Sequence, residues 1–161
     1  MKKIIIFLSI IILVLCMYKE RTIPEEIIRF RIIANSDKEE DQELKYNVLK
    51  DLYPYLINTK TNSINKERKE LQEKLPLLEN KIKERTENYT INYGYNYFPK
   101  KTYKGKTYPE GEYESLVITL GNGEGKNFWC ILFPPLCMVD KQEQKNTKYK
   151  SLFKEVINKY F

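Results

Sequence analysis

The stretch from Glu114 to Phe133 most constrains what this chain can fold into. It contains two apolar, β-rich runs, ESLVITL and NFWCILF, joined by the Gly-rich connection GNGEGK. Two such runs separated by a short Gly-containing segment are typical of a β-hairpin with a loop of moderate length. The sequence therefore predicts a hairpin here, and we expect it to form the rigid centre of a sheet.

The chain on either side alternates between strand and helix patterns. The predicted elements are a strand at 27–34, a helix capped by residues 35–37 that Pro54 ends or kinks, an amphipathic helix at 64–86, a tyrosine-rich strand from 88, a basic loop at 100–106, the hairpin and a terminal helix at 148–161. This order predicts an α/β (α+β) fold, a small single-domain sandwich with helices packed on a mainly antiparallel sheet.

The tyrosine-rich strand has large side chains at alternate positions, at Tyr89, Ile91, Tyr93, Tyr95 and Tyr97. Such a ladder can stack against bases or sugars. Tyrosine also suits a half-buried strand face, because it is large and carries one polar tip. We therefore interpret the ladder as packing.

The N-terminus has the layout of an export signal. A positive start, Met1 to Lys3, precedes an apolar run from Ile4 to Met17. As a helix this run spans roughly 21 Å, short of the ~30 Å hydrocarbon core of a bilayer. We expect residues 1–21 to be a signal peptide or signal anchor that contacts the membrane, and residues 22–161 to form one exported domain.

Export would place two cysteines in an oxidising compartment. Cys130 and Cys137 are seven positions apart, with two prolines between them, which permits a small disulfide-closed loop. The alternative is a pair of buried free thiols that behave as small hydrophobic side chains.

Charge and residue types exclude several functions. The formal net charge of +6 is spread along the chain without a basic block, so we expect no nucleic-acid partner. The absence of His removes the usual general base and the commonest zinc ligand. The acidic run after Ser36 is explained by helix capping, and the connection GNGEGK departs from the phosphate-loop pattern. We therefore predict neither a metal, nor a cofactor, nor a catalytic role.

A Pro-stiffened apolar segment follows the second run of the hairpin. It places apolar and sulfur side chains where a simple surface loop would be polar. If exposed, it is a partner-contact patch; if buried, it is a lid over the core. The candidate contact residues in it are Phe133, Pro134, Pro135, Leu136 and Met138.

Two long motifs resemble one known family. RFRIIANSDKEEDQELK, residues 29–45, and YPEGEYESLVITLGNGEGKNFWCILFPPLC, residues 108–137, closely resemble the stage II sporulation protein R family of endospore-forming bacteria. Three polar positions of the first motif, Asn35, Asp37 and Asp41, join the candidate contact residues on this basis.

The resemblance implies a signalling protein that is made in the forespore and exported into the septal intermembrane space between forespore and mother cell. Its implied partner is a membrane-embedded aspartic protease, stage II sporulation protein GA, which processes the pro-sigma-E factor. One alternative is a secreted or membrane-anchored hydrolase that uses carboxylates such as Asp37 and Asp41. Another is anion or nucleic-acid binding through residues 100–106.

Overall fold

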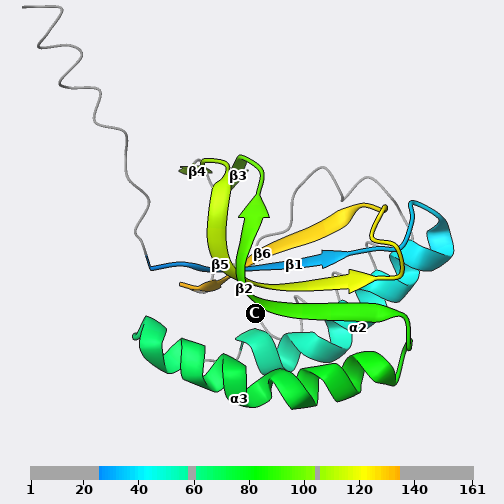
Figure 1. Ribbon diagram of the computed structural model, residues 1–161, viewed down its shortest axis with the longest axis horizontal. Helices are drawn as coiled ribbons and strands as arrows, with labels where there is room; N and C mark the ends of the chain where they lie inside the picture. Colours follow the sequence, from blue (N-terminus) through cyan, green and yellow to red (C-terminus); the bar gives the residue numbers. More distant parts are fainter. Residues whose placement is uncertain (1–25, 58–60, 104–105, 135–161) are drawn as a thin grey trace, which may run out of the picture.

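The computed structural model describes residues 26–57, 61–103 and 106–134. In chain order the elements are β1 (Ile28–Ile33), α2 (Glu39–Ile57), α3 (Ile64–Lys83), β2 (Tyr89–Phe98), β3 (Lys101–Tyr103), β4 (Lys106–Tyr108), β5 (Gly111–Leu120) and β6 (Asn127–Phe133). Both helices lie against one face of a four-stranded sheet, which confirms the predicted α+β class (Figure 1). No helix within the described residues is long and apolar enough to cross a membrane.

The strand order differs from the predicted hairpin. The order in the sheet is β2-β5-β1-β6, so β1 lies between β5 and β6 and the two runs of the opening stretch do not pair. Phe30 of β1 stands opposite Leu116 in a parallel pairing and opposite Cys130 in an antiparallel one. The hairpin prediction was therefore wrong, and the central strands are β5 and β1.

A simple length argument explains the error. Two strands that flank a third lie about 10 Å apart, and the six residues of GNGEGK can span that distance easily. The connection is therefore equally compatible with neighbouring strands and with strands one position apart. Periodicity indicates which residues face the core, but it does not indicate which strand lies beside which.

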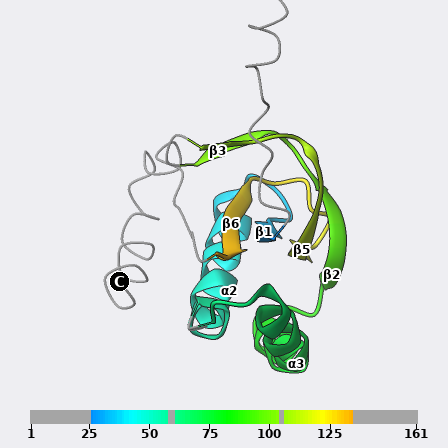
Figure 2. The ribbon, with the colours of Figure 1, turned by 90° about the vertical axis from the view of Figure 1, so that its left-hand side faces the viewer.

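The hairpin that does form joins β2 to β5. The two strands pair antiparallel over their full length, from Tyr89 opposite Leu120 to Phe98 opposite Gly111. Between them the chain makes a two-stranded ribbon of β3 and β4. The predicted basic loop at 100–106 is therefore wrong in part, because most of it belongs to this ribbon, which lies on the side of the sheet away from the helices (Figure 2).

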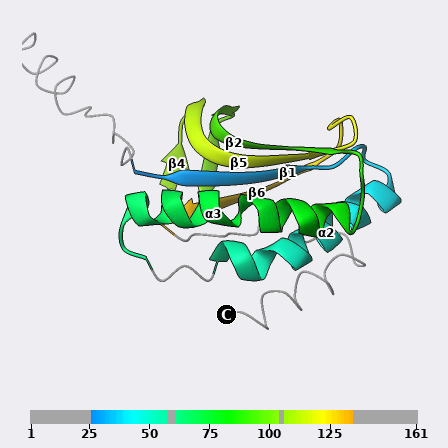
Figure 3. The same ribbon diagram turned by 60° about the horizontal axis from the view of Figure 1, so that its bottom comes forward.

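The main core lies between the sheet and the helices (Figure 3). Alternate strand residues point into it, and the predicted apolar stripes of both helices cover them. The fully buried members include Ile28, Ile32, Val48, Leu52, Leu78, Ile82, Leu116 and Ile118. Each such side chain contributes about 1.5–3 kcal/mol to folding through burial. Pro54 does not end the first helix, since α2 continues to Ile57.

The tyrosine ladder divides into two parts. Tyr89 and Tyr93 are half-buried against the core, as the packing interpretation expects. Tyr95 and Tyr97 are 72% and 57% exposed, so packing does not account for them. The predicted terminal helix at 148–161 lies outside the described residues.

Candidate functional site

Asp41, one of the predicted contact residues, holds the loop between β1 and α2 through hydrogen bonds. The Asp41 carboxylate accepts hydrogen bonds from the Asn35 amide, at 2.9 Å, and from the Ser36 hydroxyl. These bonds, that of Ser36 first, lower the pKa of the Asp41 carboxyl below its usual value. The Ser36 hydroxyl also accepts the Lys38 backbone N–H at 3.1 Å. Asp41 is therefore an ionised acceptor that shapes the entry to α2.

The same loop is joined to the connection between β5 and β6. Asn35 Oδ1 accepts the Asn122 N–H at 2.9 Å, and Asp37 Oδ1 accepts the Lys126 N–H at 2.8 Å. Two backbone bonds, from Glu124 to the Asn35 carbonyl and from Gly125 to the Ala34 carbonyl, complete the contact. We call residues 34–42 together with residues 121–126 the loop clamp. Since its N–H groups are donated within the protein, the connection GNGEGK is not an anion cradle.

A buried lysine, Lys45, forms hydrogen bonds to both loops of the loop clamp. The Lys45 side chain is fully buried, and its Nζ donates to Gln42 Oε1 at 2.8 Å and to the Lys126 carbonyl at 3.0 Å. Gln42 in turn donates to the Ser36 carbonyl at 2.8 Å. Burying an ammonium group is costly unless its donors are paired, so this chain of bonds fixes both loops.

Two glycines permit the close approach of the two loops. Gly121 has a φ of 57°, and a Cβ there would overlap the Asn35 side chain. A Cβ on Gly125 would overlap the backbone carbonyl of Ser36. The glycines that were predicted to form a hairpin loop therefore allow the connection between β5 and β6 to pack closely against the loop between β1 and α2.

The structure thus brings Asn35, Asp37 and Asp41 together, but in structural roles. Asp37 is the most exposed, and its carboxylate lies 3.8 Å from Lys126 Nζ. The Asp41 carboxylate is occupied by hydrogen bonds from Asn35 and Ser36, which accounts for its position at the entry to α2. Among the described residues there is no group of three or more His, Cys, Asp or Glu side chains that could hold a metal ion. A partner contact by these residues stays a prediction.

The structure describes only the first two residues of the predicted Pro-stiffened contact patch, Phe133 and Pro134. Phe133 is half-buried at the end of β6 and packs against the main core, whereas Pro134 is exposed after a cis peptide bond. Pro135, Leu136 and Met138 lie outside the described residues. The contact patch therefore stays a prediction for these three residues.

Cys130 is disulfide-bonded and buried in the main core. This excludes the free-thiol alternative for Cys130. The predicted partner, Cys137, lies outside the described residues, as does Cys16, so the pairing stays a prediction.

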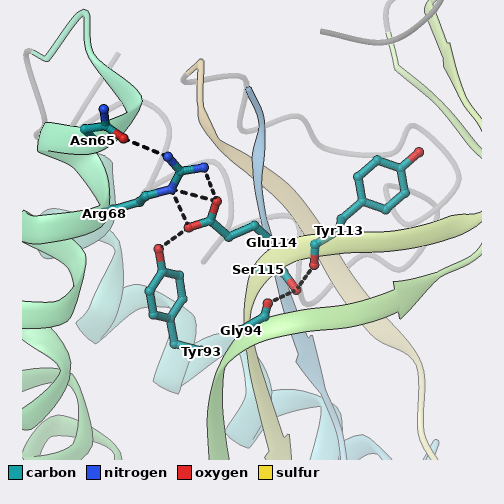
Figure 4. Close-up of polar contacts among 7 residues, drawn as sticks. All are labelled: Asn65, Arg68, Tyr93, Gly94, Tyr113, Glu114 and Ser115. Carbon is teal, nitrogen blue, oxygen red and sulfur yellow. Dashed lines mark hydrogen bonds and ion pairs between the residues drawn. The ribbon is translucent and has the colours of Figure 1, made fainter. Parts of the chain in front are cut away.

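Sequence reasoning missed an ion pair between α3 and the sheet (Figure 4). Arg68 donates to the Glu114 carboxylate through Nε at 2.9 Å and through Nη2 at 2.7 Å, and the Tyr93 hydroxyl donates to it at 2.6 Å. Burial alone would raise the pKa of Glu114, but the bonds from Arg68 and Tyr93 lower it overall. Burial, followed by the bond to Glu114, raises the pKa of Tyr93. No sequence pattern marks this contact, because its partners are 46 residues apart.

Sequence reasoning also missed the arginines of β1. Arg29 is fully buried on the sheet face away from the helices, where its guanidinium carbon lies 4.2 Å from the Phe98 ring centre and 4.6 Å from that of Tyr113. A second small core of Ile27, Tyr108 and Ile131 lies on this face, with Tyr113 and Trp129 packed against it. Alternation predicted the strand, but it gave no sign that an arginine would be enclosed by aromatic rings.

Together these features define a small α+β domain whose acidic and Gly-rich motifs join two loops, and whose second sheet face carries arginines among aromatic rings. Comparison with known families finds that residues 24–143 match the family described as stage II sporulation protein R (spore_II_R), and the chain belongs to this family. It is 43% identical over 127 residues to the stage II sporulation protein R of Bacillus subtilis (strain 168). The matched region is 73% of this chain and 56% of that relative, so the chain spans little more than half of the relative's length. No solved structure matches the chain.

Proposed function

We propose that this chain is an exported sporulation signal that activates a membrane-embedded aspartic protease, stage II sporulation protein GA. The activated protease then processes the pro-sigma-E factor in the mother cell. In this proposal the chain acts as a ligand in the septal intermembrane space and performs no catalysis itself.

Family membership is the observation that carries the proposal. The family match covers residues 24–143 and includes both sequence motifs. The positive start and apolar run at residues 1–17 support export and membrane contact. The loop clamp supports a ligand role, because the acidic residues of the first motif are used in hydrogen bonds within and between two loops.

The test is to co-produce the chain with the protease and its pro-sigma substrate in a host that does not sporulate. We expect substrate cleavage only when all three proteins are present, and none when the catalytic aspartate of the protease is replaced. Cleavage that is the same with and without the chain would refute the proposal. A form without residues 2–21 should fail to activate if export is needed, and accumulation of that form must be checked by immunoblot.

The hydrolase alternative is separated by a second measurement. Asp37→Asn and Asp41→Asn variants are compared for activation of the protease and for turnover of model ester and peptide substrates by the purified chain. Turnover that disappears in both variants, in protein that remains folded, would favour hydrolysis. Activation without any turnover in the unsubstituted chain supports the ligand role.

A further inference from the structure

Arg31 is a half-buried cation that has no ion pair with any acidic side chain in residues 26–57, 61–103 and 106–134. It extends from β1 on the sheet face away from the helices, and its guanidinium carbon lies 5.3 Å from the Phe98 ring centre and 5.2 Å from that of Trp129. Its Nε is buried and has no hydrogen-bond partner within the part of the chain that the structure describes. Burial, followed by the like charge of Arg29, lowers the pKa of Arg31. Aromatic rings partly offset this cost, but they do not supply an anion.

A second cation lies against the same indole ring. Lys101 Nζ is 5.0 Å from the ring centre of Trp129. Arg31, Lys101 and Trp129 are all half-buried, so solvent reaches each of them. We call Arg31, Phe98, Lys101 and Trp129 the cationic aromatic site. It combines two positive groups with the partly exposed indole of Trp129, beneath which the Phe98 ring is fully buried.

We propose that the cationic aromatic site binds a carboxylate group. A guanidinium edge matches a carboxylate in a two-pronged hydrogen bond, and the partly exposed Trp129 indole suits the apolar atoms next to the carboxylate. The protein already uses this chemistry once, where Nε and Nη2 of Arg68 hold Glu114. A turn of Arg31 towards an incoming carboxylate would break no hydrogen bond between Nε and a described residue.

The donors at the site favour a carboxylate over a phosphate. Phosphate sites usually present several backbone N–H groups at a loop or a helix start. Here β1 is paired on both sides, so its backbone N–H groups are committed to the sheet, and only side chains face the ligand. The ligand is therefore a singly charged carboxylate, either an acidic side chain of a polypeptide or a small free acid.

Trp129 makes the site directly measurable, because it is the only Trp of the chain. The full chain, in a non-ionic detergent, is titrated with the blocked tripeptide Ac-Val-Glu-Val-NH2, its Gln counterpart, acetate and inorganic phosphate, while Trp fluorescence and heat of binding are followed. We expect a saturable change with the Glu peptide and none with the Gln peptide. Tighter binding of the peptide than of acetate identifies an acidic side chain as the ligand, whereas equal binding identifies any free carboxylate.

Matched variants separate a local site from general charge attraction. Arg31→Gln should weaken binding of the Glu peptide by roughly tenfold or more, as expected for the loss of a charged hydrogen bond. Lys101→Gln should weaken it severalfold, and it also serves as the test if Arg31→Gln fails to fold. Lys126→Gln removes the same charge from an exposed position in the loop clamp and should change binding by less than about twofold.

Several outcomes would overturn the proposal. These are no saturable change with either carboxylate probe, equal binding of the Gln peptide, or tighter binding of phosphate than of acetate. An equal loss of affinity in Lys126→Gln and Arg31→Gln would likewise reduce the effect to net charge. The titration needs no protease, so its result is independent of the proposed signalling role.

Discussion

Arg68 on α3 donates hydrogen bonds from Nε and Nη2 to the carboxylate oxygens of Glu114 on β5, at 2.7 to 2.9 Å. The Glu114 side chain is 12% exposed, and the Tyr93 hydroxyl donates to the same carboxylate. A single carboxylate on β5 therefore links α3 to the two paired strands β2 and β5, through an ion pair with Arg68 and a hydrogen bond from Tyr93. It fixes the helix at the point where the apolar core gives way to exposed tyrosines.

Removing this charge should weaken the fold. Glu114→Gln leaves a neutral acceptor for Tyr93 but removes the ionic partner of Arg68, so we expect the free energy of unfolding to fall by about 1–3 kcal/mol. Urea denaturation followed by circular dichroism measures it. Glu73→Gln is the matched control, because its pair with Lys69 is exposed and 3.9 Å long, and it should cost less than about 0.5 kcal/mol. An equal loss of unfolding free energy in the two variants would show that the Arg68–Glu114 pair stabilises the fold no more than an exposed ion pair does.

The same carboxylate should make stability depend on pH. The pKa of Glu114 is lower in the folded protein than its ordinary value, so the folded state favours the ionised form. Its contribution is therefore fully present above the unfolded pKa of about 4.3 and is lost as pH falls through the folded pKa. We expect the difference in unfolding free energy between the unsubstituted chain and Glu114→Gln to be constant from pH 7 to 6 and to shrink below pH 4. A difference that grows on acidification would contradict this assignment.

The loop clamp predicts unequal responses from two glycines. A Cβ on Gly125 would overlap the Ser36 backbone, which cannot move aside without shifting the loop. Gly125→Ala should therefore lower the free energy of unfolding by about 1–3 kcal/mol. Gly94→Ala is the control, because its nearest neighbour is a side-chain atom at 3.6 Å, and it should change stability by less than about 0.5 kcal/mol. Similar values for the two in urea denaturation would mean that the two loops can separate freely.

The fold illustrates which features a sequence of this kind encodes locally. Alternation and helical spacing identified the strands, the helices and their buried faces, because these follow from a residue's immediate neighbours. The insertion of β1 between β5 and β6 depends on contacts between distant segments, and so do the Arg68–Glu114 pair and the buried Arg29. The cap residues at 35–37 and the Gly-rich connection were both recognised, but as separate local features. The hydrogen bond from Asn122 to Asn35 shows that they form one structure.

The disulfide gives a prediction about covalent structure. Cys130 is disulfide-bonded, and we expect peptide mapping without reductant to find it joined to Cys137. Cys137→Ser should then lower the free energy of unfolding by about 2–3 kcal/mol, the value expected for closing so short a loop. Reductant should destabilise the unsubstituted chain by a similar amount and leave Cys137→Ser unchanged. A Cys130–Cys16 peptide would contradict the predicted pairing.

The Pro-stiffened segment is the first predicted site of partner contact. If Leu136 and Met138 contact the protease, an added charge at either position would have to be buried unpaired in the complex, which costs enough to reduce activation by tenfold or more. Leu136→Asp and Met138→Asp should therefore reduce cleavage of the pro-sigma substrate strongly, while the free energy of unfolding changes by less than about 0.5 kcal/mol. Gln72→Glu adds a charge at an exposed position on α3 and should leave both quantities unchanged. Parallel losses of activation and stability would instead identify the segment as a lid over the core, and the search for the contact would then move to Asp37 and the loop clamp.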